Sequence, residues 1–318
     1  MTPAGDARDL RLGADWTRRQ RLKNDVIHAL AIAAIAVIVR LPRRIVAHLC
    51  RAIGALACRL LSRERALCEA RLVAGLGEPV PTARVRGAFV RAGETLADTL
   101  ALLDPHERAA RTLALDPDGA RVFRDALACG RGVVFISAHL GSWERMAALL
   151  AEEGFPVATV ARESYDPRFT ALYDRLRAPR GVRSIYRGRP GAAAAIVREL
   201  RAGRAVGFLV DLPGRVPCAR APLFGALADI PLGAARIALA RRAEVIVGTC
   251  APEGRVRITR VETDDLPAGR AGEPALVERI AAELDARIRV LPEAWLGLFT
   301  PPHRAEDAAP IDASIVSL

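Results

Sequence analysis

A histidine and a glutamate five residues apart are the pair in this sequence best suited to chemistry. His139 and Glu144 lie in the stretch AHLGSWE, directly after VVFIS, an apolar run typical of a buried strand. Open α/β sheets place their sites at the carboxyl ends of strands, so we expect His139 to face a crevice. A turn through Gly141 would let the Glu144 carboxylate hold one imidazole nitrogen and leave the other as a base. Alternatively, His139 is a core histidine and Glu144 a charge in the first turn of a helix.

A protein nucleophile is not evident beside this pair. The chain has no Gly-x-Ser-x-Gly segment, and Ser142 is placed to cap the helix that follows. A histidine and a carboxylate without a serine or cysteine suit direct deprotonation of a substrate hydroxyl. Lys23 is the only lysine, which excludes a P-loop and Schiff-base catalysis. The cysteines and histidines lack ligand spacing, so we expect no metal site and a reduced, cytoplasm-facing protein.

Strands and helices are predicted to alternate from about residue 79, which indicates an α/β domain with a mixed, mostly parallel sheet flanked by helices. The predicted strands cover residues 133–137, 155–161, 205–211 and 244–251. The predicted helices cover residues 83–103, 117–128, 142–154, 191–203, 232–243 and 274–290. We therefore expect a helical membrane-associating segment at residues 1–78, the α/β domain at residues 79–300 and a loose tail at residues 301–318.

The amino-terminal region combines apolar runs with positive charge. Residues 26–39 form an apolar run of 14 residues, whereas roughly 18 to 20 are needed to cross a bilayer core. The next stretch places Arg43, Arg44, Arg51 and Arg59 among apolar residues at helical spacing, which favours an amphipathic helix with its guanidiniums on anionic headgroups. The alternative is a pair of core helices in a soluble bundle.

The whole chain is basic, with a formal net charge of +11 over 318 residues. This charge suits phospholipid headgroups, phosphorylated substrates or nucleic acid, and does not choose among them. Aromatic residues make up only 4% of the chain, and the arginines are dispersed among apolar residues. Both features disfavour a nucleic-acid-binding protein, which would need stacking platforms and a basic stripe.

The pattern of a strand, Ala-His-x-Gly-x-Trp-Glu and a helix resembles the first motif of the lysophospholipid acyltransferase-like superfamily. The resemblance is closer to its branch of bacterial lipid A secondary (lauroyl and myristoyl) acyltransferases and phosphatidylinositol mannoside acyltransferases. It extends to Arg162, to Asp211 after VGFLV and to residues 222–248. Two segments depart from that branch. LGLF follows Trp295 in place of a basic triplet, and LPGRVP follows Asp211 in place of an Asp-rich pattern.

This resemblance implies a glycerol-3-phosphate acyltransferase-like fold with an amino-terminal membrane anchor. It also implies transfer of a fatty acyl group from acyl carrier protein or acyl-CoA, with no other cofactor, to a lipid hydroxyl at the cytoplasmic face of the inner membrane. The acceptor would be a lipid A precursor, a lysophospholipid or a glycolipid. The alternative within the family is a catalytically altered member that acts as a lipid-binding protein.

The resemblance also implies roles for individual residues. His139 would be the general base and Glu144 its orienting partner. The residues expected to contact substrate are Arg162, Asp211, Gly141, Trp143 and Arg187. Arg162 would bind phosphate, because a planar guanidinium binds phosphate oxygens bidentately, or it is only a solvated charge at the end of a strand. Asp211 is either a polar anchor or the polar end of a buried strand. Arg187 belongs either to a solvated loop or to a contact with phosphopantetheine or an acidic carrier protein.

Overall fold

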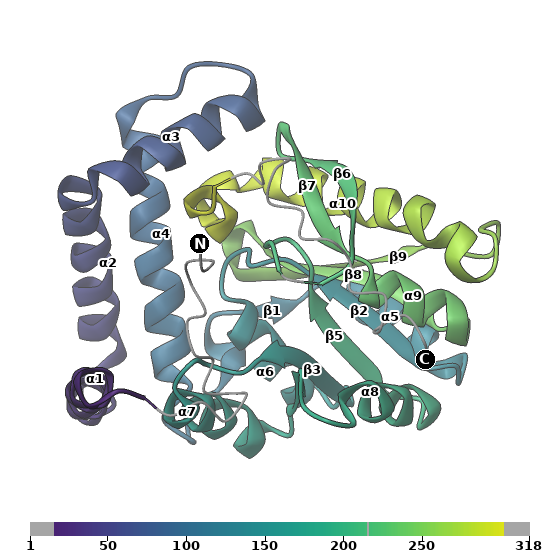
Figure 1. Ribbon diagram of the computed structural model, residues 1–318, viewed down its shortest axis with the longest axis horizontal. Coiled ribbons are helices and arrows are strands. Elements are labelled where there is room, and N and C mark those ends of the chain that lie inside the picture. The colour runs from purple at the N-terminus through teal and green to yellow at the C-terminus, as the bar shows by residue number, and fades with distance from the viewer. Residues whose placement is uncertain (1–15, 215, 302–318) are drawn as a thin grey trace, which may run out of the picture.

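The computed structural model describes residues 16–214 and 216–301, which are built around a seven-stranded sheet (Figure 1). The strand order is β1-β9-β8-β2-β5-β3-β4. The strands are β1 (Ala114–Leu115), β2 (Val133–Ser137), β3 (Val157–Arg162), β4 (Arg183–Arg187), β5 (Ala205–Leu209), β8 (Glu244–Ala251) and β9 (Arg255–Val261). Neighbouring strands in this sheet are parallel except β8 and β9. The predicted mixed, mostly parallel α/β sheet is therefore confirmed.

Helices cover both faces of this sheet (Figure 1). They are α4 (Thr82–Ala101), α5 (Pro117–Ala128), α6 (Trp143–Glu152), α7 (Pro167–Arg177), α8 (Ala192–Arg201), α9 (Gly233–Arg241) and α10 (Glu273–Val290). Between them β2 is buried along its whole length, as its five consecutive apolar or small residues require. The ends of β2, β5, β3 and β4 consequently lie side by side at one edge of the sheet.

A two-stranded hairpin stands apart from the main sheet. It consists of β6 (Cys218–Leu223) and β7 (Ala226–Pro231), and its turn holds Phe224 and Gly225 at φ values of 48° and 75°. The turn presses against α3 (Ser62–Leu76), because a side chain on Gly225 would lie 2.0 Å from the Ala74 carbonyl oxygen. The hairpin thus joins the α/β layer to the amino-terminal helices.

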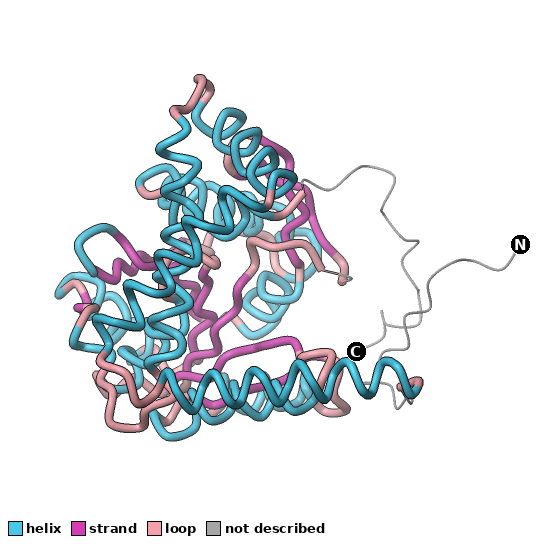
Figure 2. Tube along the Cα trace, turned by 90° about the vertical axis from the view of Figure 1, so that its left-hand side faces the viewer, coloured by secondary structure: helices cyan, strands magenta, loops and turns pink. Residues whose placement is uncertain are grey.

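Three helices, α1 (Arg18–Ile38), α2 (Arg43–Leu60) and α3, form the amino-terminal layer. In Figure 1 α4 lies between α2 and the sheet, and in Figure 2 α1 runs across the bottom of the molecule. Helices α2 and α4 approach closely at two glycines, since a side chain on Gly54 would lie 2.2 Å from the Phe89 oxygen and one on Gly93 would lie 2.2 Å from the Cys50 oxygen. The boundary predicted near residue 78 falls between α3 and α4.

Among the described residues, no single helix is long and apolar enough to cross a membrane. The pair of α2 and α3 reaches that length and composition together, with a bend of 94° between the two helices. Helix α1 has no buried residue, and α2 exposes the apolar residues Ile45, Leu49, Ile53, Leu56 and Leu60. Both stretches thus keep apolar surface in the open, which a core helix of a soluble bundle would bury.

Two of the four arginines of α2 that were predicted to lie on lipid headgroups have carboxylate partners within the protein. Arg43 donates to the Asp98 carboxylate on α4 at 2.8 Å, and Arg51 lies 3.8 Å from Glu94 on the same helix. These guanidiniums face the protein because α2 packs along α4 and the α4 carboxylates offer them partners. The predicted tail from residue 302 onward lies outside the described residues.

Candidate active site

His139 lies just beyond the end of β2 and is paired with Asp211, two residues beyond the neighbouring strand β5. The His139 ring nitrogen Nδ1 is 2.8 Å from an Asp211 carboxylate oxygen. Because an ionised carboxylate only accepts hydrogen bonds, Nδ1 must carry the proton and the neutral ring then has its lone pair at Nε2. The pair is built by the parallel register of two adjacent central strands, which brings residues 72 positions apart together.

Asp211 is held by three hydrogen bonds from protein groups and its side chain is 0% exposed. Besides the His139 ring, it accepts from the His139 backbone N–H at 2.9 Å and from Trp295 Nε1 at 2.8 Å. With its oxygens occupied in this way and no exposed surface, it has no access to a substrate. The expectation that Asp211 contacts substrate is therefore corrected: its contacts make it a positioning residue for His139.

The two members of the pair shift each other's pKa: that of His139 is raised and that of Asp211 is lowered, so both charged forms are favoured. Burial alone would lower the pKa of His139, but the Asp211 carboxylate, its hydrogen bond and the nearby Glu144 charge raise it above its ordinary value. Burial alone would raise the pKa of Asp211, but the His139 charge and the hydrogen bonds from His139 and Trp295 lower it. The ring is therefore a stronger base than a free imidazole.

The expectation that Glu144 folds back onto the His139 ring is wrong. Glu144 does lie in the first turn of α6, but its two oxygens accept from Arg177 on α7, with Nε at 2.9 Å and Nη2 at 2.5 Å. Both side chains are buried, and a buried carboxylate is best compensated by a two-pronged guanidinium. Glu144 makes no hydrogen bond to His139 and affects it only through the electrostatic effect of its negative charge.

Sequence reasoning did not single out Arg177 or Trp295 as site residues. Arg177 ends a helix that also carries Arg168 and Arg175, and nothing in its own sequence neighbourhood distinguishes it from them. The usable signal was physical: a glutamate among apolar residues in a buried helix turn requires a cationic partner somewhere in the chain. For Trp295 the signal was its indole N–H, which needs an acceptor when the ring is buried.

The segment between His139 and α6 is fixed by the chain around Trp295. The His139 carbonyl accepts from the Leu296 N–H at 3.0 Å, and the Gly141 N–H donates to the Ala294 carbonyl at 2.9 Å. Gly141 has φ +64°, and a side chain there would lie 2.8 Å from the Cys250 side chain. The structure thus places Gly141 as the residue that lets the chain turn, whereas a substrate contact through it stays a prediction.

Ser142 stands at the amino-terminal cap position of α6, as predicted, but does not cap the helix with its side chain. Its hydroxyl instead donates to the Asp98 carboxylate on α4, at 2.5 Å. Asp98 also accepts from Arg43 and lies 3.4 Å from the fully buried Arg145 of α6. This cluster ties the loop that carries the catalytic motif to the amino-terminal helices.

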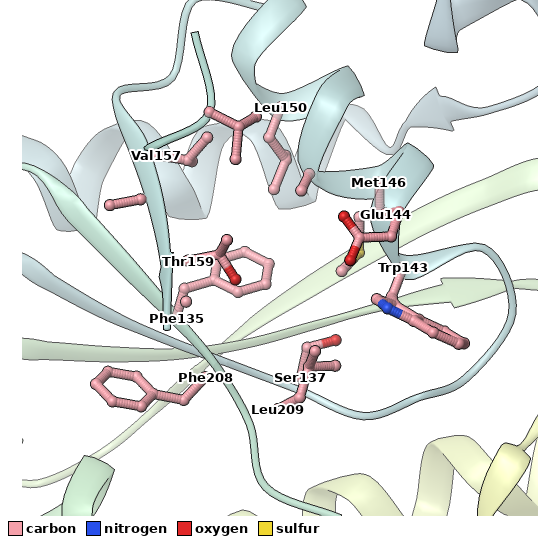
Figure 3. Close-up of a pocket in the computed structure, with 14 residues that line it drawn as sticks. Phe135, Ser137, Trp143, Glu144, Met146, Leu150, Val157, Thr159, Phe208 and Leu209 are labelled. Atoms are coloured by element: carbon pink, nitrogen blue, oxygen red, sulfur yellow. The ribbon is translucent and has the colours of Figure 1, made fainter. Parts of the chain in front are cut away.

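Trp143 lines an apolar cavity of about 50 Å³ (Figure 3). Its ring meets the His139 ring edge to face, with centroids 4.9 Å apart. The cavity runs between α6 and the strands β2, β3 and β5, and its lining is apolar apart from a few groups such as Glu144 and Thr159. Figure 3 shows the Glu144 carboxylate beside Trp143, with Leu150 and Val157 farther along the cavity.

Arg162 and Arg187 are neighbours at the carboxyl edge of the sheet. They are paired in register as the last residues of β3 and β4, and Arg162 is exposed. The Arg187 guanidinium reaches the loop after Asp211, since a side chain on Gly214 would lie 3.2 Å from its Nη1. The strand order places Arg162 two strands and Arg187 three strands from His139, on the side of β5 away from it.

A model of the bacterial lipid A biosynthesis acyltransferase family matches residues 17–300. The chain belongs to this family. No curated protein matches the sequence. Family membership confirms the predicted resemblance and the predicted enzyme class, so the protein is an acyltransferase with an acyl donor and a lipid acceptor as substrates.

In this acyltransferase the edge of the sheet brings a histidine paired with a carboxylate, an apolar cavity and two arginines within a few strands of one another. The match runs through the amino-terminal helices as well as the α/β layer, so both parts belong to the family's common structure. A nucleic-acid-binding role has no support from the family or from the site.

Proposed function

We propose that the protein transfers a fatty acyl group from a thioester of acyl carrier protein or coenzyme A to a hydroxyl of a lipid A precursor or related glycolipid, with His139 as general base. The hydrogen bond from His139 Nδ1 to the buried Asp211 carboxylate carries this proposal. It holds the ring in the tautomer that accepts a proton at Nε2 and stabilises the imidazolium that forms.

The reaction needs no protein nucleophile. His139 Nε2 takes the proton of the acceptor hydroxyl as the hydroxyl oxygen attacks the thioester carbonyl. The new C–O bond forms, the C–S bond breaks, and the proton on His139 passes to the departing thiolate. The products are an acylated lipid and a free thiol. Burial of Asp211 favours this exchange, because its negative charge acts on the imidazolium through a poorly polarisable interior.

The cavity beneath Trp143 is suited to the first carbon atoms of the acyl chain. It is lined by apolar side chains from α6 and from three strands, among them Met146, Leu150 and Phe208, and Trp143 borders both it and His139. A chain lying there would present its carbonyl carbon at the His139 ring. The Glu144–Arg177 pair closes one wall of the cavity and locks α6 onto α7.

The two arginines at the far edge of the sheet are suited to the donor. Neighbouring strands are about 4.8 Å apart. The distance from His139 to Arg162 and Arg187 is therefore two to three strand spacings, which an extended phosphopantetheine arm can bridge. A guanidinium pair of this kind attracts the phosphate of that arm or an acidic carrier surface. The exposed apolar strip of α2 would rest on the membrane that supplies the acceptor.

Mass spectrometry of lipids tests the proposal most directly. Cells with and without the gene, and cells carrying His139→Gln, are compared for acylated glycolipids and phospholipids. We expect one lipid class to lose one acyl chain in the deletion strain and in the His139→Gln strain. In isolated membranes this variant should transfer labelled acyl groups at least about a hundredfold more slowly. An unchanged rate at a normal protein level would exclude His139 as the base.

A second measurement tests the placement of the acyl chain. Ala147 lines the cavity from α6, and Ala147→Leu adds three carbon atoms to that wall. We expect this variant to prefer a shorter acyl chain than the wild type in competition between donors of different length. The matched control is Ala151→Leu, on the same helix but outside the lining, which should keep the wild-type preference.

A further inference from the structure

Arg71, on α3, is a buried arginine beside the catalytic pair. It is 8% exposed, and its guanidinium carbon lies 5.4 Å from the centre of the Trp295 ring. Trp295 in turn donates to Asp211, which holds His139. Within residues 16–214 and 216–301, the buried Nε of Arg71 has no hydrogen-bond acceptor, and no carboxylate pairs with the guanidinium.

The other buried arginines of the described chain do have carboxylate partners. Arg145 donates to Glu107 at 2.8 Å, and Arg177 forms its two bonds with Glu144. Even the partly exposed Arg289, which packs over the neighbouring Phe224 ring at 5.7 Å, is bonded to Asp285 at 2.5 Å. For Arg71 the Trp295 ring alone is a weak substitute for a carboxylate, because a cation over an aromatic face recovers little of the lost hydration.

A buried cation without an anion is costly, so its retention at this place calls for an anion that arrives with a ligand. Resting on the proposed function, we infer that Arg71 binds a phosphate group of the lipid acceptor while the acceptor hydroxyl lies at His139. A guanidinium suits this role, since its planar fork matches two phosphate oxygens.

The position of Arg71 favours the acceptor over the donor as the source of the phosphate. Arg162 and Arg187, suited to the donor, lie across β5 from His139, whereas Arg71 approaches from α3 through Trp295. Helix α3 follows α2 directly, and the residues at their junction, Leu60 and Leu61, are exposed apolar side chains. A lipid headgroup entering beside this membrane-facing junction would meet Arg71.

Stability measurements give the first test, and they need no turnover. In phosphate-free buffer, Arg71→Met should unfold at the wild-type temperature or higher, because it removes an unpaired buried charge. Millimolar inorganic phosphate should stabilise the wild type more than sodium chloride at equal ionic strength, and Arg71→Met should lose at least half of that extra shift. Arg289→Met is the matched control and should keep it.

Two results of the stability test would overturn the inference. One is equal stabilisation by phosphate of the wild type and Arg71→Met. The other is a loss of stability in phosphate-free buffer as large as that of Arg177→Met, which would mean that Arg71 already has an anionic partner in the protein. Arg71→Lys provides a second variant that keeps the charge, and it should retain part of the phosphate effect.

Kinetics then identify the source of the phosphate. For a phosphorylated acceptor, Arg71→Met should raise KM about tenfold or more, and for the same acceptor after dephosphorylation it should have little effect. The increase in KM for the phosphorylated acceptor should be the same with an acyl N-acetylcysteamine donor, which has no phosphate. A defect that disappears with this donor would assign the phosphate to the donor and overturn the inference. An equal fall in kcat with both acceptors would mean that Arg71 only positions Trp295, and this result too would overturn the inference.

Failure of the inference and failure of the proposed function give different results. If the inference alone is wrong, His139→Gln abolishes acyl transfer while Arg71→Met binds phosphate like the wild type. If the proposed function alone is wrong, no acyl transfer is found with any acceptor, yet the phosphate effect still depends on Arg71.

Discussion

The outer helices and the carboxyl edge of the sheet distribute polar and apolar groups in opposite ways. Helix α2 exposes large apolar side chains such as Leu49 and Ile53. The carboxyl edge and the helices beside it bury charges, among them Asp211, Glu144 and Arg177. In a protein surrounded by water both patterns are unfavourable. The first becomes favourable at a lipid surface and the second in an enclosed catalytic site, which is the division of labour that the proposed function assigns to the two regions.

Removing one charge of the buried ion pair between Glu144 and Arg177 should have the largest effect on stability. Glu144→Ala leaves the Arg177 guanidinium buried without its partner, and we expect a loss of about 3–5 kcal/mol in the free energy of unfolding. Denaturant titration measures it. The double variant Glu144→Leu, Arg177→Met removes both charges and should recover most of the loss.

A control at an exposed ion pair sharpens that result. Asp118 and Arg121 on α5 lie 3.2 Å apart with most of both side chains in solvent. Asp118→Ala should change the free energy of unfolding by less than about 0.5 kcal/mol. If Glu144→Ala were equally mild, the buried pair would contribute nothing to the fold, and the contrast between the two regions would lose its energetic basis.

Changing the carboxylate of the catalytic pair should alter both the rate and its pH dependence. Asp211→Asn keeps the shape but removes the charge that stabilises the imidazolium, so we expect acyl transfer to fall about a hundredfold. In the wild type the raised pKa of His139 places the rise of activity at higher pH than a free imidazole would. Without the Asp211 charge the pKa falls, so the rise should move to lower pH.

The pH–rate profile of kcat/KM, recorded in detergent-solubilised protein, measures this shift. Asp285→Asn is a suitable control, because Asp285 accepts from the Phe224 N–H and from Arg289, away from His139. It should leave the position of the rise unchanged. A profile of Asp211→Asn that coincides with the wild type, or moves to higher pH, would show that Asp211 does not set the charge state of the base.

The position of His139 in the fold was predictable from the sequence and its carboxylate partner was not. Five buried residues in a row followed by a glycine turn identify the end of a central strand, and this places His139 correctly. Which strand lies beside β2 is a matter of sheet order, and β5 is its neighbour although β3 and β4 intervene along the chain. The short spacing to Glu144 was misleading, because a first-turn side chain projects toward the next helix as readily as toward the loop.

Two of the elements missed from the sequence, β4 and α7, share one physical cause. Strand β4 (Arg183–Arg187) begins and ends with arginine at the edge of the sheet, and three of the eleven residues of α7 (Pro167–Arg177) are arginines. Neither shows the apolar run or stripe that marks a buried element. The long central strands and helices, which must bury apolar residues, were predicted close to their observed bounds.

A further prediction concerns the seam between α2 and α4. Gly54 faces the Phe89 carbonyl, and Gly54→Val would force the two helices apart. Overpacking of this kind typically costs about 1–3 kcal/mol, here measured as a lower midpoint of thermal unfolding. A midpoint equal to that of the wild type would mean that α2 is not held against α4 in solution, and that the exposed strip on α2 belongs to a loosely attached helix.

The smallest expected effect on stability concerns Ile53, which precedes Gly54 in the sequence and is exposed on α2. Ile53 is 59% exposed, so Ile53→Ser should leave the unfolding midpoint unchanged within the error of the measurement. It should instead weaken binding to anionic phospholipid vesicles about fivefold to tenfold, because about 1–1.5 kcal/mol of apolar contact with the acyl chains is lost. Vesicle flotation measures this binding, and Gly54→Val serves as the opposite case, in which stability falls first. This substitution changes one exposed apolar side chain and can alter vesicle binding only through direct contact with the lipid. If Ile53→Ser bound vesicles like the wild type, this face of α2 would therefore not be the part that meets the membrane.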